Sequence, residues 1–347
     1  MLSIEWISLN DSERWQAVVE SFEQSDIYYH HGYAESFALV SEGEPFLVYY
    51  TGNSFRACNV VQLRSILGTA LFDLTSPYGY GGWIVQGNSS PEGILQFLED
   101  YQRSCQEREI VSEVIRTHPN SCDIALLNPW YQQQDVGPIV NIDLSQEDLW
   151  ANVPSKSKNV IRKAEKLGVE IIWGGSEVLS PKDFKQIYDE TMGRAQAGDF
   201  YFFPLSFHDM FDERLKGAFS YFKAELDGEL LCAALITHNN STMNYHLSGS
   251  SSSARGIPAM NLLIYKAMEW GAANGFKTFN LGGGVGTKED SLFKFKKSFT
   301  KADPVTFSLL TKVFDEQVYA ELVNSRIENA NLDTESNYFP KYRAPLI

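Results

Sequence analysis

A serine- and glycine-rich segment, residues 248–256, lies between a predicted strand and a predicted helix that begins near Pro258. Free backbone N–H groups and the helix dipole favour an anion at the start of such a helix. We therefore expect Ser250, Ser251, Arg255 and Gly256 to bind the pyrophosphate or phosphodiester of a donor molecule. The alternative is a solvated surface loop, because serine and glycine tracts often bind nothing. The flanking strand and helix favour the anion site.

His246 is the candidate general base. It lies in a strand predicted over residues 242–248, where alternation places it with Asn244 and Ser248 on the polar face. An imidazole with an ordinary pKa of about 6.5 can accept a proton from an attacking amine. The alternative is a structural histidine, which is the commoner case.

A second glycine-rich segment, residues 281–288 (LGGGVGTK), resembles a nucleotide-binding loop only superficially. In a P-loop, serine or threonine follows the lysine, whereas Thr287 precedes Lys288 here. The dinucleotide fingerprint would need glycine at position 287. We interpret this segment as a turn at the end of a strand.

Five cations gather in residues 155–166 of a chain whose formal net charge is −15, and only Glu165 offsets them locally. This contrast favours a phosphate-bearing substrate that contacts Arg162 and Lys163. A solvated helix face is an equally good interpretation. The sequence leaves both open.

Three loop tyrosines and one arginine are further candidates for substrate binding. Tyr78 and Tyr80 lie among turn residues, Arg116 ends a predicted strand, and Tyr201 belongs to an aromatic loop. Such residues can stack on a sugar or base and hold a phosphate. Loop aromatics more often cover a core, which is the alternative.

Alternating and helical patterns predict an α/β (α+β) protein with mixed, mostly antiparallel sheets flanked by helices. The clearest pattern is a three-stranded meander over residues 221–248, with turns at Asp227-Gly228 and Asn239-Asn240. A helix, a strand, a helix and a strand follow it. Their predicted ranges are 258–274, 277–281, 290–299 and 305–310, and earlier helices are predicted at 11–24, 91–109, 155–167, 181–194 and 205–216.

The 347 residues exceed the size of most single domains, so we expect two domains, residues 1–144 and 145–347. The composition, 44% hydrophobic and 21% charged, is typical of a soluble globular protein. Neither a membrane-spanning run nor a signal peptide is evident, which predicts a cytoplasmic protein.

Several classes of function lack support. The acidic balance opposes DNA binding and disfavours tRNA. Four cysteines, Cys58, Cys105, Cys122 and Cys232, form no C-x-x-C pair, so we expect reduced, buried thiols and no metal site. Hydrolase and metalloprotease motifs are also missing from the sequence.

Four segments together resemble the Fem-type peptidoglycan-bridge aminoacyltransferases and the related Fem- or BioF-like GNAT acetyltransferases. They are residues 157–169 (SKNVIRKAEKLGV), 245–260, 270–284 (WGAANGFKTFNLGGG) and 292–299 (LFKFKKSF). The resemblance implies two GNAT-like domains, the first binding the acceptor and the second carrying the acyltransferase core.

The resemblance also implies roles for particular residues. In Fem enzymes an F-K-x-x-F segment supplies a lysine near the reacting carbonyl, and Phe295 and Lys296 match it, with Lys294 as the alternative lysine. A cation at this position would stabilise the oxyanion. Residues 78–82 and 116–119 resemble segments that line the acceptor cleft. The long paired-helix insertion of some Fem members is missing, which disfavours an aminoacyl-tRNA donor.

These observations predict an acyltransferase that moves an acyl group to an amine on a cell-envelope sugar or peptide precursor. We expect no bound cofactor and acyl-CoA as the co-substrate, with aminoacyl-tRNA as the alternative donor. A different class of function is a ligand-binding GNAT-like protein without turnover.

Overall fold

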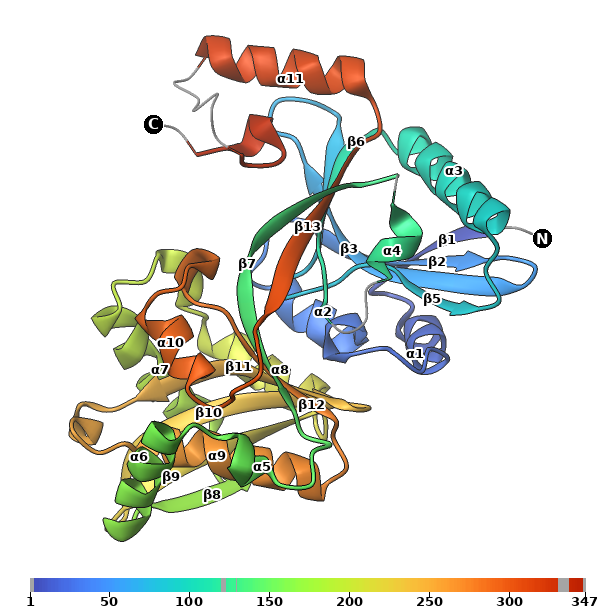
Figure 1. Cartoon of the computed structure of the whole chain (residues 1–347). Coiled ribbons are helices and arrows are strands. Elements are labelled where there is room, and N and C mark those ends of the chain that lie inside the picture. The colour runs from blue at the N-terminus through green and yellow to red at the C-terminus, as the bar shows by residue number, and fades with distance from the viewer. Residues whose placement is uncertain (1–2, 120–122, 129, 330–336, 346–347) are drawn as a thin grey trace. The chain divides into compact units, whose positions relative to one another are not determined.

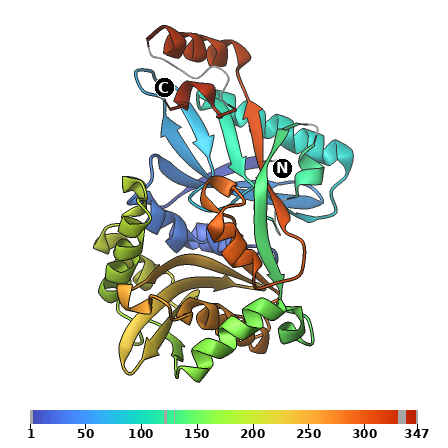
Figure 2. The same ribbon diagram turned by 60° about the vertical axis from the view of Figure 1, so that its left-hand side comes forward.

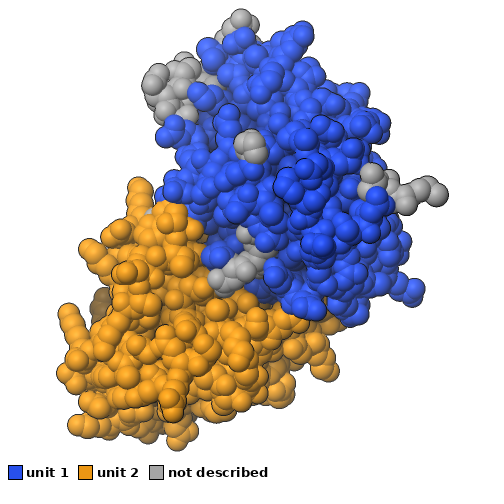
Figure 3. Space-filling view, turned by 45° about the vertical axis from the view of Figure 1, so that its right-hand side comes forward, with its two compact units in different colours: residues 1–136, 307–347 blue, residues 137–306 orange. Residues whose placement is uncertain are grey.

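The computed structural model describes residues 3–119, 123–128, 130–329 and 337–345. The chain forms two compact units, residues 1–136 with 307–347 and residues 137–306 (Figure 3). The first unit is therefore discontinuous in sequence. Two strands that pair with each other, β7 (Gln132–Asp143) and β13 (Val305–Val313), each cross the division (Figures 1 and 2).

The first unit is a sheet with the strand order β1-β2-β3-β4-β6-β13-β7, and β5 pairs with β3. All described neighbours are antiparallel except β4 and β6, which are parallel. The remaining elements of this unit are β1 (Ser3–Ser8), β2 (Glu44–Thr51), β3 (Phe55–Ser65), β4 (Phe72–Thr75), β5 (Ile84–Gly87), β6 (Ile110–Arg116), α1 (Ser12–Glu20), α2 (His31–Ala38), α3 (Pro91–Glu107), α4 (Ile124–Leu127) and α11 (Glu316–Asn329).

Helix α3 covers one face of this sheet (Figure 1). It begins where Ser90 caps the N–H of Gly93 and where Pro91 fits the first turn. Its apolar stripe, which includes Phe97 and Tyr101, packs into a core with residues of β2, β3 and β6. This burial positions β6 and the loop that follows it.

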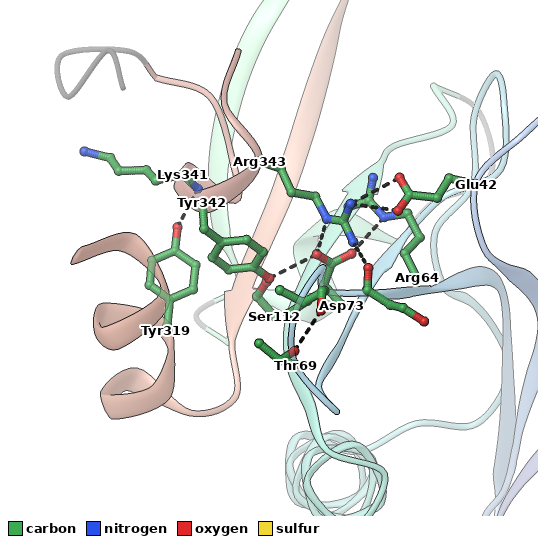
Figure 4. A network of polar contacts seen from close by, with 11 residues as sticks. Glu42, Arg64, Thr69, Asp73, Ser112, Tyr319, Lys341, Tyr342 and Arg343 are labelled. Atoms are coloured by element: carbon green, nitrogen blue, oxygen red, sulfur yellow. Dashed lines mark hydrogen bonds and ion pairs between the residues drawn. The ribbon is translucent and has the colours of Figure 1, made fainter. Parts of the chain in front are cut away.

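The C-terminal residues return to the first unit and fasten to Asp73, which is fully buried on β4 (Figure 4). Its carboxylate accepts hydrogen bonds from Arg64 Nε at 2.7 Å, from Arg343 Nε at 2.5 Å and from the Tyr342 hydroxyl at 3.1 Å. Arg343 also donates to Glu42 at 2.9 and 3.1 Å. A buried carboxylate needs such partners, so the tail is part of this unit's structure.

The second unit is a sheet with the strand order β7-β12-β11-β10-β9-β8. Strands β11 and β12 are parallel and the other neighbours are antiparallel. Its elements are α5 (Leu149–Asn152), α6 (Ser155–Lys166), β8 (Glu170–Gly174), α7 (Pro181–Arg194), α8 (Leu205–Arg214), β9 (Phe219–Leu226), β10 (Glu229–Asn239), β11 (Thr242–Ser250), α9 (Ala259–Ala273), β12 (Thr278–Gly282) and α10 (Ser291–Lys297).

The predicted meander is confirmed as β9, β10 and β11. Its tight turns hold Asp227, Gly228 and Asn240 at positive φ, a conformation that glycine, asparagine and aspartate tolerate best. Helix α9 packs on β9 and β10 together with α6, while α7 packs on β11 together with α8. The two helix pairs cover opposite faces of the sheet (Figure 1).

The expected fold class is confirmed, but the expected boundary after residue 144 differs from the division in the structure. Residues 137–144 pack with the second unit and residues 307–347 with the first. A boundary between units that falls inside a strand cannot be read from the local sequence, because the strand pattern continues unchanged on both sides of it. Five helices and strands of the first unit were also not predicted, namely β1, β5, α2, α4 and α11.

Two further expectations concern membrane spans and thiols. Within the described residues, none of the helices combines the length and the apolar character needed to span a membrane. Cys58, Cys105 and Cys232 are buried free thiols, as expected, and burial raises the pKa of each. Cys122 lies outside the described residues.

Candidate functional site

The parallel strands β11 and β12 pair over only three residues and then part. The pairs are Thr242 with Thr278, Met243 with Phe279, and Asn244 with Asn280. At the last pair, Asn280 Nδ2 donates to Asn244 Oδ1 at 3.4 Å, and Asn280 Oδ1 accepts from the N–H of Gly282 at 2.8 Å. Strands that part expose backbone N–H and C=O groups to whatever lies between them. This opening is the centre of the candidate site.

Lys296 lies beside β11 on helix α10 and is only 9% exposed. Its ammonium group donates to the carbonyl oxygen of Gly283 at 2.8 Å and lies 6.0 Å from the centre of the Tyr245 ring. Burial lowers its pKa from 10.5 to about 8, against a smaller opposing effect of Asp290. The predicted alternative, Lys294, is exposed. The geometry therefore favours Lys296 as the functional lysine.

Asp290 organises the glycine-rich segment around Lys296. Its Oδ1 caps α10 by accepting from the N–H of Phe293 at 2.8 Å, and its Oδ2 accepts from the N–H of Val285 at 2.9 Å. A side chain at Gly284 would place its Cβ 2.1 Å from the carbonyl oxygen of Lys288, so only glycine fits. The segment is a folded turn at the end of β12, as the sequence predicted.

His246 is placed differently from the expectation. A bulge interrupts the pairing of β10 and β11, where Tyr245 opposes Ile236 and Leu247 opposes Leu235. His246 is the extra residue, and its ring stacks on Phe211 of α8 at 5.6 Å. Burial and the nearby His208 lower its pKa to about 3. Such a ring is a weak base at neutral pH, so the arrangement gives no support to His246 as the general base.

The four residues expected to bind the donor lie at the end of β11, which is Ser250, and in the loop between β11 and α9, which contains Ser251, Arg255 and Gly256. The backbone N–H of Ser250 donates to Thr191 Oγ1 at 2.8 Å, and its carbonyl accepts from Arg194, so α7 fixes the end of β11. Ser251 Oγ is shielded from solvent and has no hydrogen-bond partner within the described part of the chain. Arg255 and Gly256 are exposed.

Helix α9 begins after this loop with no side-chain cap at its N-terminus. Its first N–H groups therefore stay available to an external acceptor. Ser251 Oγ and Arg255 lie in the loop just before these N–H groups, where the sequence predicts an anion site, and the anion site stays a prediction.

Arg162 and Lys163 are exposed on α6. Lys163 Nζ approaches the carbonyl oxygen of Gly256 at 3.4 Å, and the Arg162 guanidinium lies 5.3 Å from the centre of the Trp150 ring. The basic helix therefore lies next to the anion-binding loop. The sequence alone did not reveal this adjacency.

Two other candidates of this unit lie apart from the lysine. Phe295, which was expected to contact substrate, is half-buried and packs edge-on against Phe299 at 5.3 Å, so it helps to hold α10 on the core. Tyr201 is exposed and contacts Phe200 at 5.5 Å. Neither side chain has a described contact with Lys296.

In the first unit, the two predicted acceptor segments are neighbours. The N–H of Gly81 donates to the carbonyl of Arg116 at 2.7 Å, and the N–H of His118 donates to the carbonyl of Gly81 at 2.9 Å. Tyr80 packs edge-on against His118 at 5.7 Å, and Nε2 of the buried His118 lies 2.7 Å from Oδ2 of the buried Asp26. The sequence did not identify this histidine–aspartate pair.

Tyr78 and Arg116 complete this cluster. Tyr78 is half-buried and stacks on Phe37 at 4.9 Å, while its carbonyl accepts from the Tyr33 hydroxyl at 2.9 Å. Arg116 is exposed at the end of β6, and among the described residues its guanidinium forms no ion pair. Aromatic rings beside such a cation suit a ligand with a planar or sugar group and an anionic group.

The parallel strands of the first unit do not part in the same way. After β4, the N–H of Ser76 still donates to the carbonyl of Val114 at 3.2 Å, and Gly81 forms a parallel bridge with Thr117. The chain after β4 thus keeps β6 paired to its end. Only the second unit offers an open parallel pair next to a buried lysine within the described residues.

The side chains of the described residues include no cluster of three or more histidines, cysteines or carboxylates that could hold a metal ion.

Comparison with known families defines the class of the second unit. Residues 155–297 match the family described as acetyltransferase (GNAT) domain. This segment contains both the open strand pair and Lys296. The second unit thus carries a GNAT domain, the domain class of N-acyltransferases, which confirms the expectation from the sequence. A search of the curated proteins gives no match.

Solved structures show where the whole fold occurs. FemX matches with a TM-score of 0.69 at 13% identity, covering 92% of this chain and 99% of that one. L-PGS from Bacillus licheniformis matches with a TM-score of 0.56 at 15% sequence identity, and the match covers 92% of this chain and 98% of that one. A tandem GNAT protein from the clavulanic acid biosynthesis pathway matches with a TM-score of 0.51 at 10% sequence identity, and the match covers 91% of this chain and 99% of that one. The chain therefore has the fold of FemX and of tandem GNAT proteins.

Proposed function

We propose that this protein transfers an acyl group from acyl-CoA to an amine, and that the reaction takes place beside Lys296. The observation that carries the proposal is a buried ammonium group held against the opening between β11 and β12. When an amine attacks a thioester or ester carbonyl, negative charge develops on the carbonyl oxygen. A fixed cation in a site shielded from water stabilises this charge more in the transition state than in the ground state.

The open strand pair supports an extended donor. Backbone groups released where β11 and β12 part can pair with an extended chain that carries amide groups, as an added strand would. The pantetheine arm of CoA is such a chain. The uncapped start of α9 and Ser251 Oγ would then receive its phosphates.

The acceptor is proposed to be an amine on a cell-envelope sugar or peptide precursor, bound through the first unit. Tyr78, Tyr80 and the exposed Arg116 support a ligand with a sugar or base and a phosphate. Similarity of the fold to FemX and L-PGS is compatible with this acceptor class. Catalysis would then rest on positioning of the amine and stabilisation of the oxyanion.

The first experiment offers acetyl-CoA and a panel of amino sugars, peptides and sugar nucleotides to the purified protein and measures release of free CoA thiol. Lys296→Ala should lower kcat by about 10²- to 10³-fold. Lys294→Ala is the matched control and should retain activity. Equal activity of both variants would contradict the role of Lys296.

An aminoacyl ester of tRNA is the second candidate donor, favoured by the basic face of α6. Transfer of a radiolabelled aminoacyl group, with no turnover of acetyl-CoA, would select it. A protein that binds ligand but turns over neither donor would be a binding module. Native mass spectrometry of the purified protein, searched for retained CoA or sugar nucleotide, would identify its ligand directly.

A further inference from the structure

Helix α6 bears a basic pocket outside the opening that holds Lys296. The pocket has a volume of about 480 Å³ and is lined by Asn159, Arg162, Lys163, Lys166 and Leu167. Three of its five lining residues are cations, in a chain whose formal net charge is −15. Its charge is therefore opposite in sign to that of the protein as a whole.

These cations are not neutralised by the protein. In the part of the chain that the structure describes, no carboxylate lies within ion-pair distance of Arg162, Lys163 or Lys166. Glu165, their neighbour on α6, lies 4.0 Å from Lys266 of α9 instead. Like charges three and four residues apart on a helix repel each other. A bound anion would offset this repulsion. We therefore prefer an anion site to a solvated helix face as the explanation for three neighbouring cations.

The pocket is connected to the proposed reaction centre by contacts. Lys163 approaches the carbonyl oxygen of Gly256 at 3.4 Å, and Gly256 lies four residues before Met260 in the first turn of α9. The Sδ of Met260 accepts a hydrogen bond from the Tyr245 hydroxyl at 3.4 Å, and the Tyr245 ring faces Lys296. One series of contacts, through the start of α9, thus joins the pocket to Lys296.

We infer that the α6 pocket is an anion subsite that binds a phosphate group at the far end of the acyl donor, beyond the phosphates held at the start of α9. The inference rests on the proposed acyl transfer and adds a site beyond the loop between β11 and α9. The shared ligand chemistry is a phosphate group attached to a ribose. The nucleotide part of CoA and the acceptor end of a tRNA both supply it.

The first test is a comparison of two donors, acetyl-CoA and S-acetylpantetheine, which lacks the nucleotide and its phosphates. The triple variant Arg162→Ala, Lys163→Ala, Lys166→Ala should lower kcat/KM for acetyl-CoA by about tenfold to a hundredfold, through KM, and leave that for S-acetylpantetheine unchanged. The double variant Lys182→Ala, Lys216→Ala removes exposed cations elsewhere on the second unit and is the matched control.

The second test uses direct binding, so it does not depend on turnover. Isothermal titration with CoA, and fluorescence anisotropy with an RNA hairpin ending in CCA, are compared for wild type and both variants. If the triple variant binds CoA more weakly than the wild type and the control variant does not, the subsite is supported and the nucleotide part of CoA is its ligand. If the wild type binds the hairpin with an affinity that falls steeply between about 50 and 200 mM salt, and the triple variant loses this binding, the subsite is supported with tRNA as its ligand.

The two proposals can fail separately. Unchanged affinity of the triple variant for both CoA and the hairpin would overturn the subsite, even if acyl transfer proceeds. Absence of turnover with every donor, together with a loss of CoA or hairpin affinity in the triple variant, would overturn the proposed reaction and retain the pocket as a phosphate site.

Discussion

Replacing Lys296 with methionine should stabilise the protein at pH 7 while removing its proposed activity. Burial lowers the pKa of this lysine from 10.5 to about 8. Keeping it charged at pH 7 thus costs the folded state about 3 kcal/mol relative to the unfolded chain. Methionine removes this cost but leaves the carbonyl of Gly283 without its donor, a loss of about 1–2 kcal/mol. The variant should be more stable by about 1–2 kcal/mol.

The pH dependence of the free energy of unfolding provides a second, independent test of this prediction. Because the pKa of Lys296 is lower in the folded state, the unfolded chain binds more protons between about pH 8 and 10.5. Wild-type stability should therefore gain from this group as the pH rises through that interval. The variant lacks this gain, so its advantage should shrink by about 2 kcal/mol between pH 7 and about pH 9.5.

Urea unfolding at the two pH values measures both effects, with hydrogen exchange of α10 assigning the transition to the second unit. Lys294→Met is the control, because Lys294 is exposed two residues away on the same helix. Its stability should stay within about 0.5 kcal/mol of wild type at both pH values. If Lys296→Met is no more stable than this control at pH 7 and shows the same dependence on pH, the reasoning about a buried charge is refuted.

Other groups that have a shifted pKa or are buried give further predictions. Activity should fall above about pH 8 as Lys296 loses its proton, which a pH profile of kcat measures. His246→Asn should leave any acidic limb of that profile in place, because the pKa of His246 is about 3. Glu113 is buried between two tyrosine hydroxyls and burial raises its pKa from 4.5 to about 7, so the first unit should lose about 3 kcal/mol of stability as the pH rises from about 4.5 to above 7. Thermal scans of Glu113→Gln should lack this loss. Asp73→Asn should destabilise the first unit by about 3 kcal/mol, since Arg64 and Arg343 lose their shared carboxylate, and limited proteolysis should then release residues 307–345 while the second unit stays intact.

Strong local patterns made most of the second unit predictable. The turns at Asp227-Gly228 and Asn239-Asn240 separate alternating runs, so β9, β10 and β11 follow from the sequence. Lys296 was identified by resemblance, yet helical spacing also selects it. It lies three residues after Phe293, on the same face of α10, whereas Lys294 does not.

Other features had no local signal. The extra residue in β11 moves His246 out of the alternating pattern, and nothing in its neighbours indicates a bulge. Helix α2 was missed because five of its eight residues are buried and the other three are partly buried, which removes the periodic contrast that identifies a helix. The contact between Lys163 and Gly256 joins positions 93 residues apart, so only the tertiary structure reveals it.

The return of the C-terminal residues to Asp73 has a consequence for synthesis on the ribosome. The first unit needs β13 in its sheet and Arg343 at its buried carboxylate, and both are synthesised after the second unit. The second unit lies wholly within residues 137–306, so it can complete its core while the earlier residues still await their last strand. The half that is made first should therefore be the half that folds last, and arrested nascent chains that end before residue 307 should protect only the second unit from protease.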